Sequence, residues 1–288
     1  MKSLFDSNCR FATKMNDGIH SQIHNKLMTH HQDIQDINAE RSTKGGAYGF
    51  IESFLRRFRL ATFLGVLIPV AVAYIICLGT ALTPGIYLFR WALSEVSEFN
   101  GVLQAFILGL SVAIGFVAFV ITLILIVPIL NAPALPFIKP YRGPWFSLES
   151  IPWLYHNALT YLVRYTVLDF ITPTPLNIFF FRAMGMKIGK GCMINSSNIS
   201  DPCLIHLGDY VTIGGSAYLM AHYGMKGYLV IDHLKIGAGA TIGLAAKVLG
   251  GVEIGRRATV APNATVFPKT VIKEMEKFGV PDKITTAD

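Results

Sequence analysis

Residues 230–272 read VIDHLKIGAGATIGLAAKVLGGVEIGRRATVAPNATVFPKTVI, and an aliphatic side chain stands at every sixth position. An α-helix would repeat its apolar residues about every 3.6 positions, and an antiparallel hairpin would alternate them every second position. Neither pattern is present, so the period of six indicates neither an α-helix nor an antiparallel hairpin. The aliphatic positions are Val230, Ile236, Ile242, Val248, Ile254, Val260, Val266 and Ile272.

A period of six predicts short strands that wind into a stacked coil. Small or β-branched residues stand four positions after most of the aliphatic residues, and Gly237, Gly243 and Gly255 directly follow three of them. Each six-residue unit then forms one strand with its aliphatic side chain inward, and three units make one triangular turn. Stacked turns share backbone hydrogen bonds and bury a common aliphatic column. We therefore predict a β-helix over residues 185–273, followed by a C-terminal tail at 274–288.

The first half of the chain has the composition of a membrane anchor. Of 288 residues, 52% are hydrophobic and only 15% are charged. No charged residue occurs between Arg59 and Arg90, nor between residues 100 and 138, and each interval exceeds the roughly 20 residues that a helix needs to cross a bilayer. Residues 51–137 are thus expected to hold two spanning helices, preceded by a polar, largely disordered tail at 1–50.

Charged residues beside these intervals predict the orientation. Arg56, Arg57 and Arg59 precede the first interval, and Lys139 and Arg142 follow the second. Because basic residues flank spans on the cytoplasmic side, both the N-terminus and the β-helix are expected in the cytoplasm. The aromatic segment 138–184 suits helices at the headgroup level. The net charge of +7 then reflects lipid as the partner and not nucleic acid, for which no basic-aromatic motif occurs.

The six-residue units IGAGAT, IGLAAK, VLGGVE, IGRRAT and VAPNAT resemble the transferase hexapeptide family of acyltransferases, which includes maltose, galactoside and serine acetyltransferases. The ending GVPDKI at residues 279–284 resembles a signature of that family. A closer resemblance is to the membrane-tethered hexapeptide domain at the C-terminus of poly-lysine synthetase-like nonribosomal peptide synthetases, carried by TPLNIFFFRAMGMKIG from Thr174 and DPCLIHLGD from Asp201.

This resemblance implies the fold and the reaction. The implied fold is mixed, with two transmembrane α-helices and interfacial helices followed by a left-handed parallel β-helix, assembled as a homotrimer. The implied reaction moves an acyl group from acyl-CoA, above all acetyl-CoA, to the hydroxyl or amine of a small-molecule or lipid-linked acceptor, with no metal. A bacterial inner membrane is the expected location.

Acyl transfer needs a base, and histidine is the natural one because its ordinary pKa of about 6.5 is close to working pH. The repeat is interrupted between Leu219 and Val230, and His222 stands at the start of this break, where the resembling acetyltransferases carry their catalytic histidine. A carboxylate of Asp201 or Asp232 is expected to orient the imidazole.

The other candidate residues follow from the resemblance. Gly239, Ala240 and Ala245 are expected to bind the coenzyme through backbone amides, and Lys269 through its charge. His206 and His233 are interpreted as exposed corner residues.

Two other functions fit the same fold. A zinc-dependent carbonic anhydrase needs three histidines, two of them closely spaced, whereas His222 and His233 are eleven positions apart. A catalytically silent trimeric scaffold in a membrane assembly is the second alternative. The histidine in the interrupted repeat favours the acyltransferase.

Overall fold

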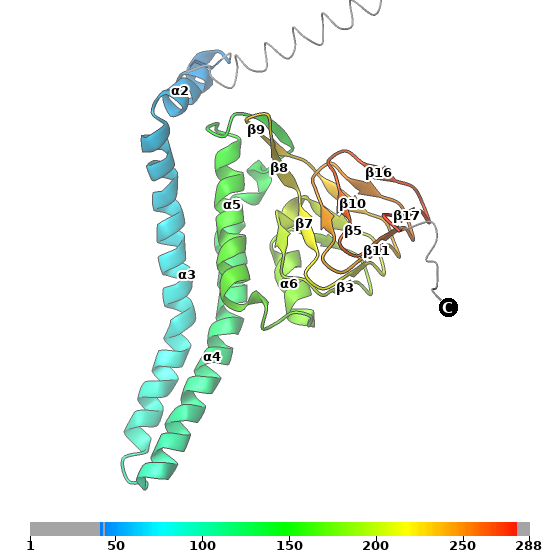
Figure 1. Ribbon diagram of the computed structural model, residues 1–288. Coiled ribbons are helices and arrows are strands. Elements are labelled where there is room, and N and C mark those ends of the chain that lie inside the picture. Colours follow the sequence, from blue (N-terminus) through cyan, green and yellow to red (C-terminus); the bar gives the residue numbers. More distant parts are fainter. Residues whose placement is uncertain (1–40, 43, 281–288) are drawn as a thin grey trace, which may run out of the picture. The chain divides into compact units, whose positions relative to one another are not determined.

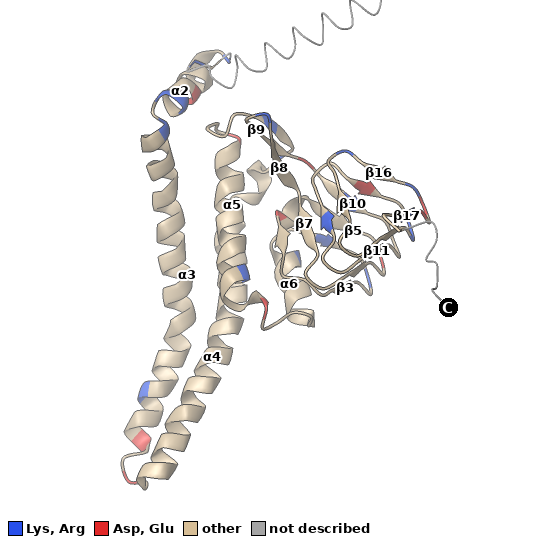
Figure 2. Cartoon of the chain, in the orientation of Figure 1, with Lys and Arg blue, Asp and Glu red and all other residues tan. Residues whose placement is uncertain are grey.

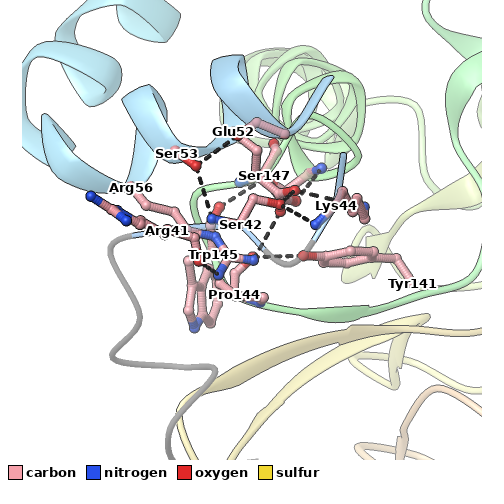
Figure 3. A network of polar contacts seen from close by, with 12 residues as sticks. Arg41, Ser42, Lys44, Glu52, Ser53, Arg56, Tyr141, Pro144, Trp145 and Ser147 are labelled. Atoms are coloured by element: carbon pink, nitrogen blue, oxygen red, sulfur yellow. Dashed lines mark hydrogen bonds and ion pairs between the residues drawn. The ribbon is translucent and has the colours of Figure 1, made fainter. Parts of the chain in front are cut away.

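The computed structural model describes residues 41–42 and 44–280. It divides into two compact units, Met1–Phe58 and Arg59–Asp288. Most of the predicted polar tail and all of GVPDKI beyond Val280 lie outside the described residues. In the first unit, helix α2 (Gly46–Arg57) begins within the segment predicted as tail. Ser42 and Arg56 both donate hydrogen bonds to the Glu52 carboxylate, at 2.6 Å and 2.9 Å (Figure 3).

The second unit begins with two long helices, α3 (Arg59–Glu95) and α4 (Gly101–Asn131), which lie side by side (Figure 1). Both are long and apolar enough to cross a membrane. Helix α3 carries charged side chains only near its ends, and α4 carries none (Figure 2). A methyl group on Gly85 would lie 3.2 Å from the Gly115 Cα atom. The two backbones therefore approach at this pair of glycines as closely as small residues allow.

Three shorter helical segments cover α3 and α4 on one side. They are α5 (Ser150–Val163), which continues as the π-helix η2 (Arg164–Leu168), and α6 (Pro175–Ala183). A 3₁₀ turn, η1 (Leu135–Phe137), precedes them. The Tyr74 hydroxyl of α3 donates to the Ala158 carbonyl of α5 at 2.6 Å. The aromatic segment expected at 138–184 thus forms helices that pack directly on α3 and α4.

The β-helix consists of three parallel sheets. The first sheet joins β2 (Lys187–Ile188), β5 (Ile205–Leu207), β10 (Leu234–Ile236), β13 (Glu253–Ile254) and β16 (Val271–Ile272). The second joins β3 (Met193–Ile194), β6 (Thr212–Ile213), β11 (Thr241–Ile242), β14 (Thr259–Val260) and β17 (Lys277–Phe278). The third joins β4 (Ile199–Ser200), β7 (Tyr218–Met220), β12 (Lys247–Val248) and β15 (Thr265–Val266).

The predicted turn of three six-residue units is confirmed by the strand register. Ile236 pairs with Ile254, and Ile254 pairs with Ile272, so equivalent positions recur one full turn apart. The aliphatic positions from Ile236 to the end of the repeat are buried in one column. Glycine follows Ile236 because a methyl group on Gly237 would lie 2.7 Å from the backbone nitrogen of Arg256 in the next turn.

Two boundaries differ from the expectation. Val230 belongs to β9 (Tyr228–Ile231), which pairs antiparallel with β8 (His222–Met225) and β1 (Tyr141–Gly143), and so it lies outside the parallel coil. Its agreement with the period of six is coincidental, because the loop that leaves the coil folds as a hairpin. Parallel pairing also continues to β17, beyond residue 273 where the repeat was expected to end.

Candidate active site

His222 stands where the chain leaves the coil after β7 and enters the β8–β9 hairpin. Its side chain is 18% exposed, and its Nδ1 atom lies 2.6 Å from Oδ2 of Asp201. Within the described residues, nothing is hydrogen-bonded to its other ring nitrogen, Nε2. The imidazole is therefore held from one side and open on the other.

The Asp201 carboxylate accepts the hydrogen bonds that hold the site together. This carboxylate is completely buried, and Asp201 begins the 3₁₀ turn η3 (Pro202–Leu204) with a φ of 59°. Oδ1 accepts hydrogen bonds from the Trp153 indole and the Asn157 amide, each at 2.7 Å. Oδ2 accepts from the Ala221 backbone at 3.0 Å and from His222. Hydrogen bonds in this number stabilise a charged carboxylate away from water.

The tautomer of His222 follows from this arrangement. An ionised carboxylate only accepts hydrogen bonds, so the Nδ1 atom of His222 must carry the proton that faces Asp201. The lone pair of a neutral imidazole is then on Nε2, the atom that is open. The Trp153 ring meets the imidazole edge to face, with 4.9 Å between ring centres. This is the geometry of a general base with an orienting carboxylate.

Of the two carboxylates expected to orient His222, the structure brings only Asp201 to the imidazole. The Asp232 carboxylate instead accepts a hydrogen bond from the His233 backbone at 2.8 Å, and its own backbone nitrogen donates to the Ala221 carbonyl. His206 is exposed in the middle of β5, on the first sheet. His206 and His233 line a cavity of about 220 Å³ beside that sheet, and within the described residues no hydrogen bond joins either side chain to the Asp201–His222 pair.

The residues expected at the coenzyme are spread over the coil. The amides of Gly239, Ala240 and Ala245 already donate to the carbonyls of Asp209, Gly237 and Gly215 at 2.7–3.2 Å. In the single chain these amide protons stabilise the coil and do not point to a ligand. Lys269 is exposed, and a methyl group on Gly251 would lie 3.0 Å from the Asp232 carboxylate and 3.4 Å from the Lys269 side chain. Lys269 thus lies on the corner of the coil that also carries the histidine loop.

Sequence reasoning missed Trp153 and Asn157, both on α5. A signal was present, because α5 carries the polar residues His156, Asn157 and Thr160 in an otherwise apolar sequence. All three are buried. Trp153 and Asn157 are one helical turn apart, a spacing that places two side chains on one face.

Two other titratable groups lie within the electrostatic reach of Asp201. Burial lowers the pKa of His156 to about 4, against a smaller opposite effect of the Asp201 charge. Burial, and then the Asp201 charge, raise the pKa of Cys203 to about 12. Both groups are therefore neutral in the neutral pH range. Within the described residues, no three His, Cys, Asp or Glu side chains form a cluster that would hold a metal ion.

Acid is expected to weaken the fold through His156. The unfolded chain binds a proton on His156 near pH 6.5, whereas the folded chain excludes it until about pH 4. The contribution of His156 to the free energy of unfolding is therefore complete above pH 6.5 and is lost as the pH falls toward 4. The loss is about 3 kcal/mol of unfolding free energy. Unfolding midpoints in detergent between pH 7.5 and 5 should fall more steeply for the parent protein than for His156→Asn. Parallel curves for the two proteins would contradict this assignment.

No protein-family model and no curated protein matches the chain. Among solved structures, serine acetyltransferase from Neisseria gonorrhoeae is 19% identical with a TM-score of 0.27, over 42% of this chain and 48% of that one. The chain thus spans about half the length of that enzyme. Serine acetyltransferase from Brucella abortus strain S19 is 14% identical with a TM-score of 0.27, over 65% and 91%.

A third similar structure is a hexapeptide-repeat acetyltransferase from Vibrio cholerae O1 biovar eltor in complex with acetyl coenzyme A. It is 18% identical with a TM-score of 0.30, over 50% of this chain and 92% of that one. Similarity at this level carries no inference about activity.

Proposed function

We propose that this protein is a membrane-bound acyltransferase that moves an acyl group from acyl-CoA to a hydroxyl or amine acceptor at the cytoplasmic face of the membrane. The observation that carries the proposal is the buried Asp201 carboxylate holding His222 with its Nε2 atom open. A neutral imidazole fixed in this tautomer is suited to take a proton from an acceptor at neutral pH.

The proposed reaction balances with these two residues. Nε2 of His222 removes the proton from the acceptor, whose oxygen or nitrogen attacks the thioester carbonyl. The carbon–sulfur bond then breaks, and the imidazolium returns the proton to the coenzyme thiolate. The Asp201 charge stabilises the imidazolium between these two steps.

The coenzyme is proposed to be acetyl-CoA. The exposed Lys269, on the corner with the histidine loop, supplies a positive charge for one of its phosphates. Gly239, Ala240 and Ala245 lie along the same coil, but their backbone N–H groups already donate within it. Any contact of these residues with the coenzyme is therefore made by their other atoms.

The decisive experiment is to incubate the purified protein in detergent with labelled acetyl-CoA and a membrane extract. A labelled product that depends on the protein is expected, and its identity gives the acceptor. No protein-dependent reaction with any fraction of the extract would instead favour a silent scaffold.

The location proposed is a bacterial inner membrane, crossed by α3 and α4, with the protein assembled as a homotrimer. Exposed apolar side chains cover both long helices, as in helices that face lipid. Arg59 begins α3, and Lys139 and Arg142 follow α4, so the β-helix and the N-terminus are proposed to share the cytoplasmic side.

This topology makes a testable prediction. Cysteines introduced into the turn between α3 and α4, at Ser97 or Asn100, should react with a membrane-impermeant maleimide added to intact spheroplasts, because the turn is expected outside. A cysteine introduced at the exposed Lys269 should react only after the membrane is opened. Labelling at position 269 in intact spheroplasts would rule out the proposed orientation.

A further inference from the structure

Helix α5 supplies both hydrogen bonds that Oδ1 of Asp201 receives. Trp153 and Asn157 donate to this one oxygen at 2.7 Å each, and they are themselves buried. Within the described residues, the other oxygen accepts from the Ala221 amide and from His222, where the chain leaves the coil. Half of these hydrogen bonds to the carboxylate therefore come from α5.

The same helix is tied to both long helices. Its Ala158 carbonyl accepts from Tyr74 of α3 at 2.6 Å, and its Tyr155 hydroxyl donates to the Leu130 carbonyl of α4 at 3.3 Å. His156, which is buried and neutral, lies 2.9 Å from the Asn131 side-chain oxygen through Nδ1. That oxygen only accepts, so the imidazole donates. Consecutive residues of α5 thus contact the long helices and the site carboxylate.

We propose that α5 is part of the catalytic unit: Trp153 and Asn157 are positioning residues that hold Asp201, and through it His222, so the base is assembled by a helix docked on α3 and α4. The proposal rests on the function proposed above. It assigns a role in the chemistry to the helical segment that joins the long helices to the β-helix.

The physical reason is the cost of a buried carboxylate. Without donors, the ionised form in a site closed to water is strongly disfavoured. When His222 is neutral, the pair carries the net negative charge of Asp201, and losing a donor destabilises it strongly. When His222 is protonated, the imidazolium offsets the Asp201 charge, so the same loss costs less. The pair should then bind a proton about tenfold more tightly, which moves its titration up by about one pH unit.

Other titratable groups around the pair do not produce the same effect. His156 and Cys203 stay neutral because burial holds their pKa values at about 4 and about 12. Burial also raises the pKa of Tyr223 on β8. Tyr161, which contacts Ser200 at 3.1 Å, and Asp232 are the further neighbours. All of these side chains are unchanged in the variants described next.

The experiment uses the full chain in detergent and follows His222 directly. Diethyl pyrocarbonate modifies only the unprotonated imidazole, and mass spectrometry of the peptide that contains His222 gives its rate of modification at each pH. Trp153→Phe keeps an aromatic ring but removes the indole N–H, and Asn157→Leu keeps the volume but removes the amide. Trp145→Phe is the matched control, because the Trp145 ring meets the Trp153 ring edge to face, with 6.4 Å between ring centres, and within the described residues it does not donate to Asp201.

Each single variant should raise the pH of half-maximal modification by about one unit, and the double variant by more. Trp145→Phe should leave it in place. Asn157→Gln, which keeps an amide, should shift it less than Asn157→Leu. If Asn157→Leu folds poorly, Trp153→Phe still tests the donors to the same oxygen. The acid limb of kcat/KM for acyl transfer should move in the same direction.

Modification profiles of Trp153→Phe and Asn157→Leu that superimpose on the parent profile would overturn the proposal. The readout does not require acyl transfer. A protein without transferase activity that still shows these shifts would overturn the proposed function and leave the role of α5 in place.

Discussion

His222→Ala is expected to lower the rate of acyl transfer by about 10² to 10⁴, the usual contribution of a general base. The fold should be retained, because His222 is partly exposed at the edge of the hairpin and contributes little to the buried aliphatic column. Coenzyme binding should change little, since the lost group acts on the acceptor. The measurement is the rate with the true acceptor at saturating acetyl-CoA, together with the unfolding midpoint.

His206→Ala and His233→Ala are the matched controls for His222→Ala. Both residues line the cavity beside the first sheet, and within the described residues no hydrogen bond joins either imidazole to Asp201, so each variant should keep most of the parent activity. These controls separate loss of the base from a general effect of removing an imidazole. A His222→Ala protein with near-parental activity would leave the proposed mechanism without its base, and the scaffold would then be the better interpretation.

Asp201→Asn is expected to lower the rate by a similar factor, on the order of 10² to 10⁴, through the tautomer of His222. The single oxygen of the new amide can still accept from Trp153 and Asn157. The amide nitrogen then faces Nδ1 of His222 and donates to it, which moves the imidazole proton to Nε2. A protonated Nε2 cannot accept a proton from the acceptor.

The stability of Asp201→Asn should also fall, because the Ala221 amide loses its charged partner. The expected cost is about 1.5–3 kcal/mol of unfolding free energy, the range for a hydrogen bond to a charged group. Asp232→Asn is the matched control, since in the described part of the chain that carboxylate accepts from the His233 backbone and not from His222, and it should retain activity within a few-fold. An Asp201→Asn protein as active as Asp232→Asn would exclude Asp201 as the orienting group.

Regular features of the fold could be predicted because they repeat locally. The aliphatic period of six predicted the buried column and the three-unit turn, since every unit meets the same environment as its neighbours in the stack. Long uncharged intervals predicted α3 and α4 for a similar reason, because length and composition suffice. Val230 shows the limit of a periodic pattern, which one matching residue in a hairpin can extend by chance.

The candidate coenzyme amides show a second limit. Their positions were inferred from a resemblance, but in a stacked coil most backbone amides donate to a neighbouring turn. The Gly239 amide donates to Asp209 and the Ala245 amide to Gly215. The pairing that makes the repeat stable is thus the reason that these amides are occupied.

The sequence by itself placed His222 at the break in the repeat, and it left Asp201 and Asp232 as equal candidates beside it. Only the tertiary structure decided between them, because the choice depends on contacts between residues far apart in the chain. Asp201 lies 48 positions from Trp153 and 21 from His222, and no local period relates these positions. They meet because α5 packs between the long helices and the coil. A carboxylate buried there is stable only when it accepts hydrogen bonds from the neighbouring donors.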